Sequence, residues 1–127
     1  FGLGMDADED GRTLGMKLTM FDTTDKTNVT VLHELKLDSR YSPALYNHKA
    51  ILISPAKKLI GFPVDSGYVF YGYSDAAGFH RLLYTDTAEW SYDSRGLYIG
   101  NYAYIVGSNA LTVYNLDSFT FAGRLPF

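Results

Sequence analysis

The sequence contains no cysteine among its 127 residues. That absence excludes disulfide bonds, thiolate metal sites and a cysteine nucleophile. Long apolar runs are also missing: the longest, such as residues 50–53, are strand-sized, whereas a membrane-spanning helix needs roughly 18 apolar residues. Positive charge is not in excess, because 11 Lys and Arg face 14 Asp and Glu, which gives a net charge of −3. The chain therefore lacks the basic surface of a nucleic-acid-binding protein and has no segment suited to span a membrane.

The first residues carry neither an initiator methionine nor a basic stretch followed by an apolar one, as a signal peptide would. We therefore expect the chain to be a piece of a longer protein. Its length fits one domain, residues 1–127, with a core large enough to stand alone.

Proline is scarce, with four residues, whereas aromatic residues and glycine are abundant: 11 Tyr, 8 Phe, 1 Trp and 12 Gly. Aromatic and β-branched side chains suit a pleated, half-buried surface, and frequent glycine suits tight turns. The composition therefore favours an all-β fold.

Short runs with strand character alternate with turn-forming clusters along almost the whole chain. We predict about ten strands and no helix. Their ranges are 14–22, 29–37, 48–54, 58–64, 68–74, 79–85, 96–99, 102–106, 111–115 and 119–125. Residues 85–94 are predicted to form a loop that contains at most one helical turn.

The strand pairs repeat along the chain. Asp22, Ser74 and Asn115 each end a strand that leads through a polar turn into another strand, and they are 52 and 41 residues apart. Antiparallel four-stranded units that repeat at this spacing are typical of β-propeller blades. The alternative is a β-sandwich or meander with coincidental spacing.

About ten strands make about two and a half blades, so the pattern predicts a partial β-propeller. Closed propellers have roughly four to eight blades, and a partial one exposes strand edges and apolar blade faces. We therefore expect a homo-oligomer, or a domain completed by the missing parts of the parent chain.

Three runs carry a resemblance to a known family: GMDADEDGRTLGMKLTMFDTTD, ALYNHKAILISPAKKLIGFPV and RGLYIGNYAYIVGSNALTVYNLDS. Together they resemble the C-terminal portion of a prokaryotic family of secreted proteins with a C-terminal β-propeller domain, distantly related to WD-repeat propellers. The resemblance implies an exported, often surface-associated protein and little specific chemistry. One departure is Asn47, which precedes His48 where the family pattern has an acidic residue; this weakens any charge relay there.

The stretch DADEDG places Asp6, Asp8 and Asp10 on alternate positions before Gly11. Alternate carboxylates in a tight loop can converge on a hard cation, so these three residues are candidate Ca²⁺ ligands. The closing ligands are missing, because Lys17 and Leu14 stand at the twelfth and ninth loop positions. The alternative, which the pattern favours, is a solvated acidic turn whose Asp side chains bind backbone amides.

Four residues are candidate ligand-binding residues: Trp90, Tyr92, Tyr46 and His48. Tyrosine and tryptophan combine apolar area with a polar tip, which suits protein or glycan recognition. The three histidines lie far apart in sequence, there is no GxSxG motif, and no helix follows the glycines of residues 2–11. The sequence therefore offers no catalytic residue.

These features predict an extracytoplasmic binding or scaffolding module, secreted or on the cell surface of a prokaryote, that contacts a protein or a glycan and has no catalysis of its own. The alternative is a part of a cation-assisted extracellular hydrolase. An enzyme should gather its perturbed titratable groups in one pocket, whereas a scaffold should show a broad aromatic face.

Overall fold

A computed structural model describes residues 1–65, 67–86 and 94–127, and these residues form strands joined by turns and two short 3-10 helices. The elements in chain order are β1 (Gly2–Ala7), β2 (Thr13–Asp22), β3 (Thr30–Leu37), η1 (Pro43–Leu45), η2 (His48–Ala50), β4 (Leu52–Ser54), β5 (Leu59–Val64), β6 (Gly67–Ser74), β7 (Gly78–Asp86), β8 (Arg95–Ile99), β9 (Tyr102–Val106), β10 (Ala110–Asn115) and β11 (Thr120–Pro126).

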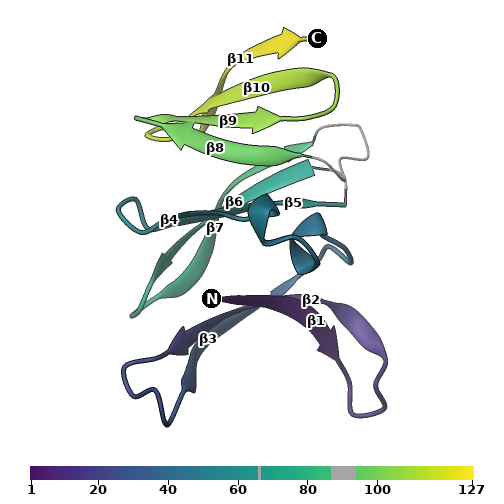
Figure 1. Cartoon of the computed structure of the whole chain (residues 1–127), viewed down its shortest axis with the longest axis vertical. Coiled ribbons are helices and arrows are strands. Elements are labelled where there is room, and N and C mark those ends of the chain that lie inside the picture. Colours follow the sequence, from purple (N-terminus) through teal and green to yellow (C-terminus); the bar gives the residue numbers. More distant parts are fainter. Residues whose placement is uncertain (66, 87–93) are drawn as a thin grey trace.

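The strands form three antiparallel sheets that are stacked along the long axis of the molecule (Figure 1). The first sheet has the order β1-β2-β3, the middle sheet β4-β5-β6-β7, and the last sheet β8-β9-β10-β11 in sequence order across the sheet. Each four-stranded sheet is a simple meander, as in a propeller blade. The predicted all-β fold and partial β-propeller are therefore confirmed.

The two central strands of the middle sheet, β5 and β6, are buried on both faces, which explains why they read as nearly continuous apolar runs rather than as alternating ones. One core cluster fills the space toward the first sheet and includes Met16, Leu18 and Phe62. The second fills the space toward the last sheet and includes Tyr68 and Ile105. The two clusters hold the three sheets together as one stack.

The repeat that the sequence indicated has a common structural basis. Asp22, Ser74 and Asn115 each end the next-to-last strand of their sheet, and each side-chain oxygen accepts a backbone N–H of the following turn. Each of these strands also pairs with the outermost strand through a β-bulge. The sheets therefore share a turn and a bulge at equivalent positions.

Two local expectations were wrong. Residues 2–7 form a strand, β1, although its two glycines weaken the strand signal, because pairing with β2 satisfies its backbone. The strand expected over residues 48–54 begins only at Leu52. Residues 48–50 form η2 instead, because the Asn47 side chain accepts the N–H of Lys49 and caps a helical turn.

Candidate functional site

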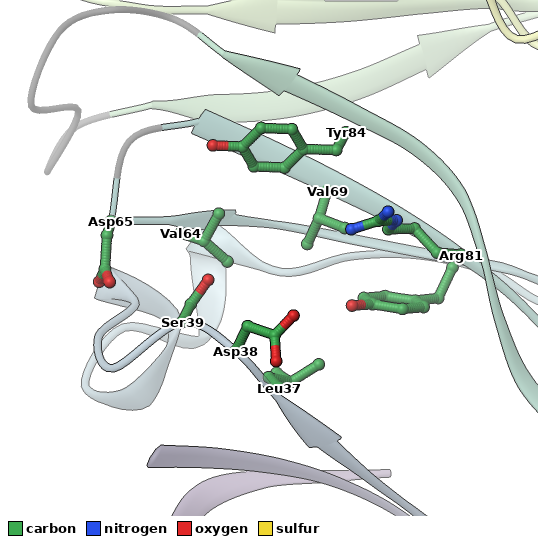
Figure 2. A pocket seen from close by; sticks show the side chains of 9 residues that line it. Leu37, Asp38, Ser39, Val64, Asp65, Val69, Arg81 and Tyr84 are labelled. Carbon is green, nitrogen blue, oxygen red and sulfur yellow. The ribbon is translucent and has the colours of Figure 1, made fainter.

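A cleft of about 260 Å³ lies between the first and middle sheets, at the end of the sheets where β3 and β5 finish (Figure 2). Apolar side chains form part of its wall, and polar and charged ones complete it. The lining residues are Leu37, Asp38, Ser39, Val64, Asp65, Val69, Tyr71, Arg81 and Tyr84. We refer to it below as the inter-sheet cleft.

The wall from the first sheet depends on a close backbone approach. Gly15 has φ +137°, and a Cβ built there would lie 3.2 Å from the carbonyl oxygen of Leu37. Met16 donates its N–H to the carbonyl of Ser39 at 3.3 Å, which fixes the segment that follows β3. This segment carries Asp38 at the cleft edge. Gly15, on the neighbouring strand β2, therefore helps to set the position of Asp38.

The wall from the middle sheet depends on the bulge between β6 and β7. Phe70 pairs with Leu83, but Tyr71 pairs with Arg81, so Leu82 is the extra residue. Without the bulge, Leu82 would stand beside Tyr71. Because paired residues share a face, the bulge places Arg81 next to Tyr71 on the cleft side, a re-aiming role that bulges often have next to functional sites.

The electrostatics of the cleft centre on the Tyr71 hydroxyl. Burial raises the pKa of Tyr71, while the positive charge of Arg81 lowers it and the negative charge of Asp38 raises it further. Both charged groups therefore lie near this phenol. Asp65, at the far side, accepts the backbone N–H of Arg40 at 3.1 Å, which ties the connecting segment to the end of β5.

The predicted ligand-binding residues Tyr46 and His48 lie on this connecting segment between β3 and β4, and both are exposed. Tyr46 is 83% exposed and lies 6.3 Å from the ring of Tyr41, measured between centroids. Buried Ser42 anchors the segment, because its hydroxyl donates to the carbonyl of Pro63 and accepts the N–H that starts η1. Trp90 and Tyr92 lie outside the described residues.

The acidic turn joins β1 to β2, and its carboxylates have protein partners. Asp6 is the next-to-last residue of β1 and lies 3.2 Å from Lys36 and 3.6 Å from Lys17, and the interaction with Lys36 is the main cause that lowers its pKa. Asp8 accepts the backbone N–H groups of Asp10 and Arg12. The structure therefore directs Asp6 and Asp8 to separate partners, and the Ca²⁺ site stays a prediction.

Two features are absent from the described residues. Residues 1–65, 67–86 and 94–127 hold no group of three His, Cys, Asp or Glu side chains arranged to bind a metal ion. Within the same residues, none of the helices has the length and apolar character needed to cross a membrane.

A second candidate surface is the free face of the last sheet, which points away from the middle sheet. Pairing along β8 and β9 puts Leu97 and Ile99 on the same face as Tyr104 and Tyr102, while Ala103 is buried toward the middle sheet. Leu97, Ile99 and Tyr102 are 42%, 65% and 43% exposed. A contiguous apolar patch on a sheet face marks an interaction surface.

Stacked four-stranded meanders with a bulged outer strand define a β-propeller type of protein. The comparison with known families agrees: a family model for the beta propeller domain matches residues 1–119. The chain therefore belongs to the beta propeller domain family. The beta propeller domain points to a binding or scaffolding module.

The chain is also similar to an uncharacterized protein of Archaeoglobus fulgidus, with 29% identity over 117 residues. The match covers 91% of this chain but 18% of that relative, so the chain spans about a fifth of its length. No solved structure matches the chain.

Sequence reasoning missed the inter-sheet cleft. Asp38 and Arg81 carry no local motif, and they line one cleft only because two sheets stack. One signal was present: Asp38 and Asp65 each follow directly after an apolar strand residue, Leu37 and Val64, at the ends of successive sheets.

Proposed function

We propose that the chain is an extracytoplasmic binding and scaffolding module that docks a further blade on the free face of the last sheet. The observation that carries the proposal is the apolar character of this face. Leu97, Ile99 and Tyr102 expose large apolar side chains there, and Leu125 of β11 pairs with Leu111 on the same sheet and is 59% exposed. A water-exposed face of this kind is an aggregation hazard unless a partner covers it.

The opposite end of the stack has different chemistry. On the free face of the first sheet, Lys17 pairs with Asp6 and with Glu34, and Lys36 pairs with Asp6. Strand pairing puts Gly4 opposite Lys17 on this face, and a Cβ at Gly4 would have open space around it. This face is charged around Gly4, although Phe21 and Val31 expose apolar side chains near one end of it.

The internal interfaces suggest what covers the apolar face. Between the middle and last sheets, the large Tyr68 ring is packed against Gly96 and near Ala103 in the same core cluster. A further four-stranded sheet with small residues facing outward fits the free face in the same manner. Its source is a second copy of the chain or the missing parts of a longer protein, since the chain spans 18% of its archaeal relative.

Light scattering of the 127-residue chain over a concentration series tests this docking. We expect concentration-dependent association of the wild type and loss of association in Ile99→Lys. The control is Ile53→Lys, at an exposed isoleucine on the edge strand β4 of the middle sheet, and it should associate as the wild type does. A wild-type monomer that binds no hydrophobic dye would contradict the proposal. A dye-binding monomer would assign the face to further blades of the parent chain.

The partner outside the stack is a protein or a glycan, and the exposed Tyr46 and His48 support contact at the end of the sheets that carries the cleft. The family resemblance supports secretion or display on the cell surface of a prokaryote. Fractionation of cells that express the full-length protein tests the location.

Calorimetric titration with Ca²⁺ tests the predicted cation site at Asp6, Asp8 and Asp10. A titration without heat would contradict Ca²⁺ binding there.

The distribution of perturbed groups supports a binding module over a part of a hydrolase. The carboxylates with lowered pKa values are Asp6, in its lysine pair, and Asp22 and Asp25, whose pKa values are lowered mainly by hydrogen bonds from Thr24 and Thr27. All three lie on the first sheet or its turn, outside the inter-sheet cleft. An active site would gather such groups in one pocket.

A further inference from the structure

The inter-sheet cleft holds two charged side chains of opposite sign that do not pair with each other. All three ion pairs of the described residues lie on the first sheet, among Asp6, Lys17, Glu34 and Lys36. Within residues 1–65, 67–86 and 94–127, neither the Asp38 carboxylate nor the Arg81 guanidinium makes an ion pair or hydrogen bond.

These two groups face one volume from opposite walls. Figure 2 shows Asp38 on the side of the first sheet and Arg81 on the strand of the middle sheet, with the charged ends directed into the space between them. Both influence the pKa of the Tyr71 hydroxyl, so an acceptor, a hydroxyl and a donor converge there. Two backbone features fix the positions of these residues: the β6–β7 bulge on the side of Arg81 and the close approach at Gly15 on the side of Asp38.

The size and the walls of the cleft restrict what can enter. A volume of about 260 Å³ corresponds to roughly nine water molecules at about 30 Å³ each, enough for a group the size of an amino acid. Leu37, Val64 and Val69 provide apolar contact beside the charged groups. The lining thus offers an apolar surface, one anionic wall and one cationic wall.

We propose that the inter-sheet cleft binds a zwitterionic group, with a ligand ammonium beside Asp38 and a ligand carboxylate beside Arg81. A guanidinium matches a carboxylate with two parallel hydrogen bonds, and charge-assisted hydrogen bonds are stronger than neutral ones. A neutral sugar would leave both charges without counter-charges. The source is a free amino acid or neighbouring basic and acidic side chains of an extended peptide, which recur on one face at every second residue.

The test measures binding of matched probes to the 127-residue chain by amide chemical-shift perturbation. The probes are L-leucine, L-leucinamide (which lacks the carboxylate), N-acetyl-L-leucine (which lacks the ammonium), a blocked Lys-Gly-Glu tripeptide and D-glucose. We expect saturable binding of L-leucine or the tripeptide in the millimolar range, with shifts at the cleft residues. Because both charged groups are exposed, loss of either ligand charge should weaken binding about fivefold.

Variants link each ligand charge to its protein partner. In Arg81→Gln, L-leucine and L-leucinamide should bind equally, and in Asp38→Asn, L-leucine and N-acetyl-L-leucine should bind equally. Arg124→Gln and Asp117→Asn remove exposed charges from the last sheet and its β10–β11 turn and should change nothing. Binding of L-leucine alone assigns a free amino acid, and binding of the tripeptide alone assigns a peptide segment.

Several results would overturn the proposal: no saturable shift with either zwitterionic probe at about 10 mM, tighter binding of D-glucose, or ligand preferences that survive both cleft substitutions. None of these readouts depends on the free face of the last sheet. Failure here would therefore leave the docking proposal standing, and failure of docking would leave the cleft proposal standing.

Discussion

The Tyr68 hydroxyl gives the sharpest test of the packing between the middle and last sheets. Tyr68 is fully buried, and its hydroxyl has no hydrogen-bond partner among the described residues. Burial raises the pKa of Tyr68 far above its usual range, so the hydroxyl stays protonated and retains a donor to satisfy. A buried polar group without a partner costs about 1–3 kcal/mol.

We therefore expect Tyr68→Phe to stabilise the chain. Removing the hydroxyl removes this cost. The small space left beside Gly96 loses some packing contacts, and this loss offsets part of the gain. The net gain should be about 1 kcal/mol in the free energy of unfolding, or roughly 3–5 °C in Tm for a chain of this size. Urea unfolding followed by circular dichroism measures it, with Tyr46→Phe as the control because that ring is 83% exposed.

The partner position supplies the second half of the experiment. A Cβ at Gly96 would lie 2.2 Å from the Tyr68 hydroxyl and 2.6 Å from the ring carbon that bears it. Gly96→Ala should therefore cost about 2–3 kcal/mol as an overpacked site. In the Tyr68→Phe background the cost should fall by about 1 kcal/mol yet persist, because the ring carbon remains too close.

One result would refute this reasoning. If Tyr68→Phe lowered the free energy of unfolding by more than about 1 kcal/mol, the hydroxyl would be making a favourable hydrogen bond. Equal costs for Gly96→Ala in both backgrounds would show that the two groups do not meet.

Three further predictions concern the first sheet, the connecting segment and a turn. Ser42→Ala should lower the free energy of unfolding by about 1–2 kcal/mol in urea titrations, because one buried hydroxyl both caps η1 and bonds a β5 carbonyl. The pKa of Asp6 is lowered from 3.8 mainly by Lys36, so its stabilising effect is present above pH 3.8 and is lost as the pH falls through the lower folded-state value. Asp6→Asn should accordingly be less stable than wild type at neutral pH and approach it in acid unfolding measurements; a constant difference would contradict the ion-pair account. Ser74→Ala should cost about 0.5–1 kcal/mol by thermal unfolding, because it removes the acceptor of the Ala77 N–H at the β6–β7 turn, and no change would show that the turn needs no cap.

The fold could be predicted largely from local signals. Alternating aromatic runs and polar turns identify nearly all the strands, and the ends at Asp22, Ser74 and Asn115 identify the repeat because their side chains do cap equivalent turns. The strand β1 was missed because its glycines carry no strand preference, and pairing with β2 supplies what propensity lacks.

The site could not be predicted to the same degree. The bulge that places Arg81 beside Tyr71 depends on pairing between strands and leaves no mark in the sequence. The lysines that engage Asp6 are neighbours only across the sheet, so the acidic stretch resembles a cation loop when it is considered alone. The relative positions of these side chains are set by strand register and sheet stacking rather than by composition.

The unlike ends of the stack have a consequence for symmetry. One end is bulky and apolar, and the other is charged around Gly4, so contact between two copies joins an end of one kind to an end of the other. Such a contact is heterologous and gives either a closed ring or an open filament. Two copies supply six sheets, within the roughly four to eight that close a propeller. The two unlike faces would therefore arrange the subunits of any homo-oligomer head to tail, and closure into a ring would prevent growth into a filament.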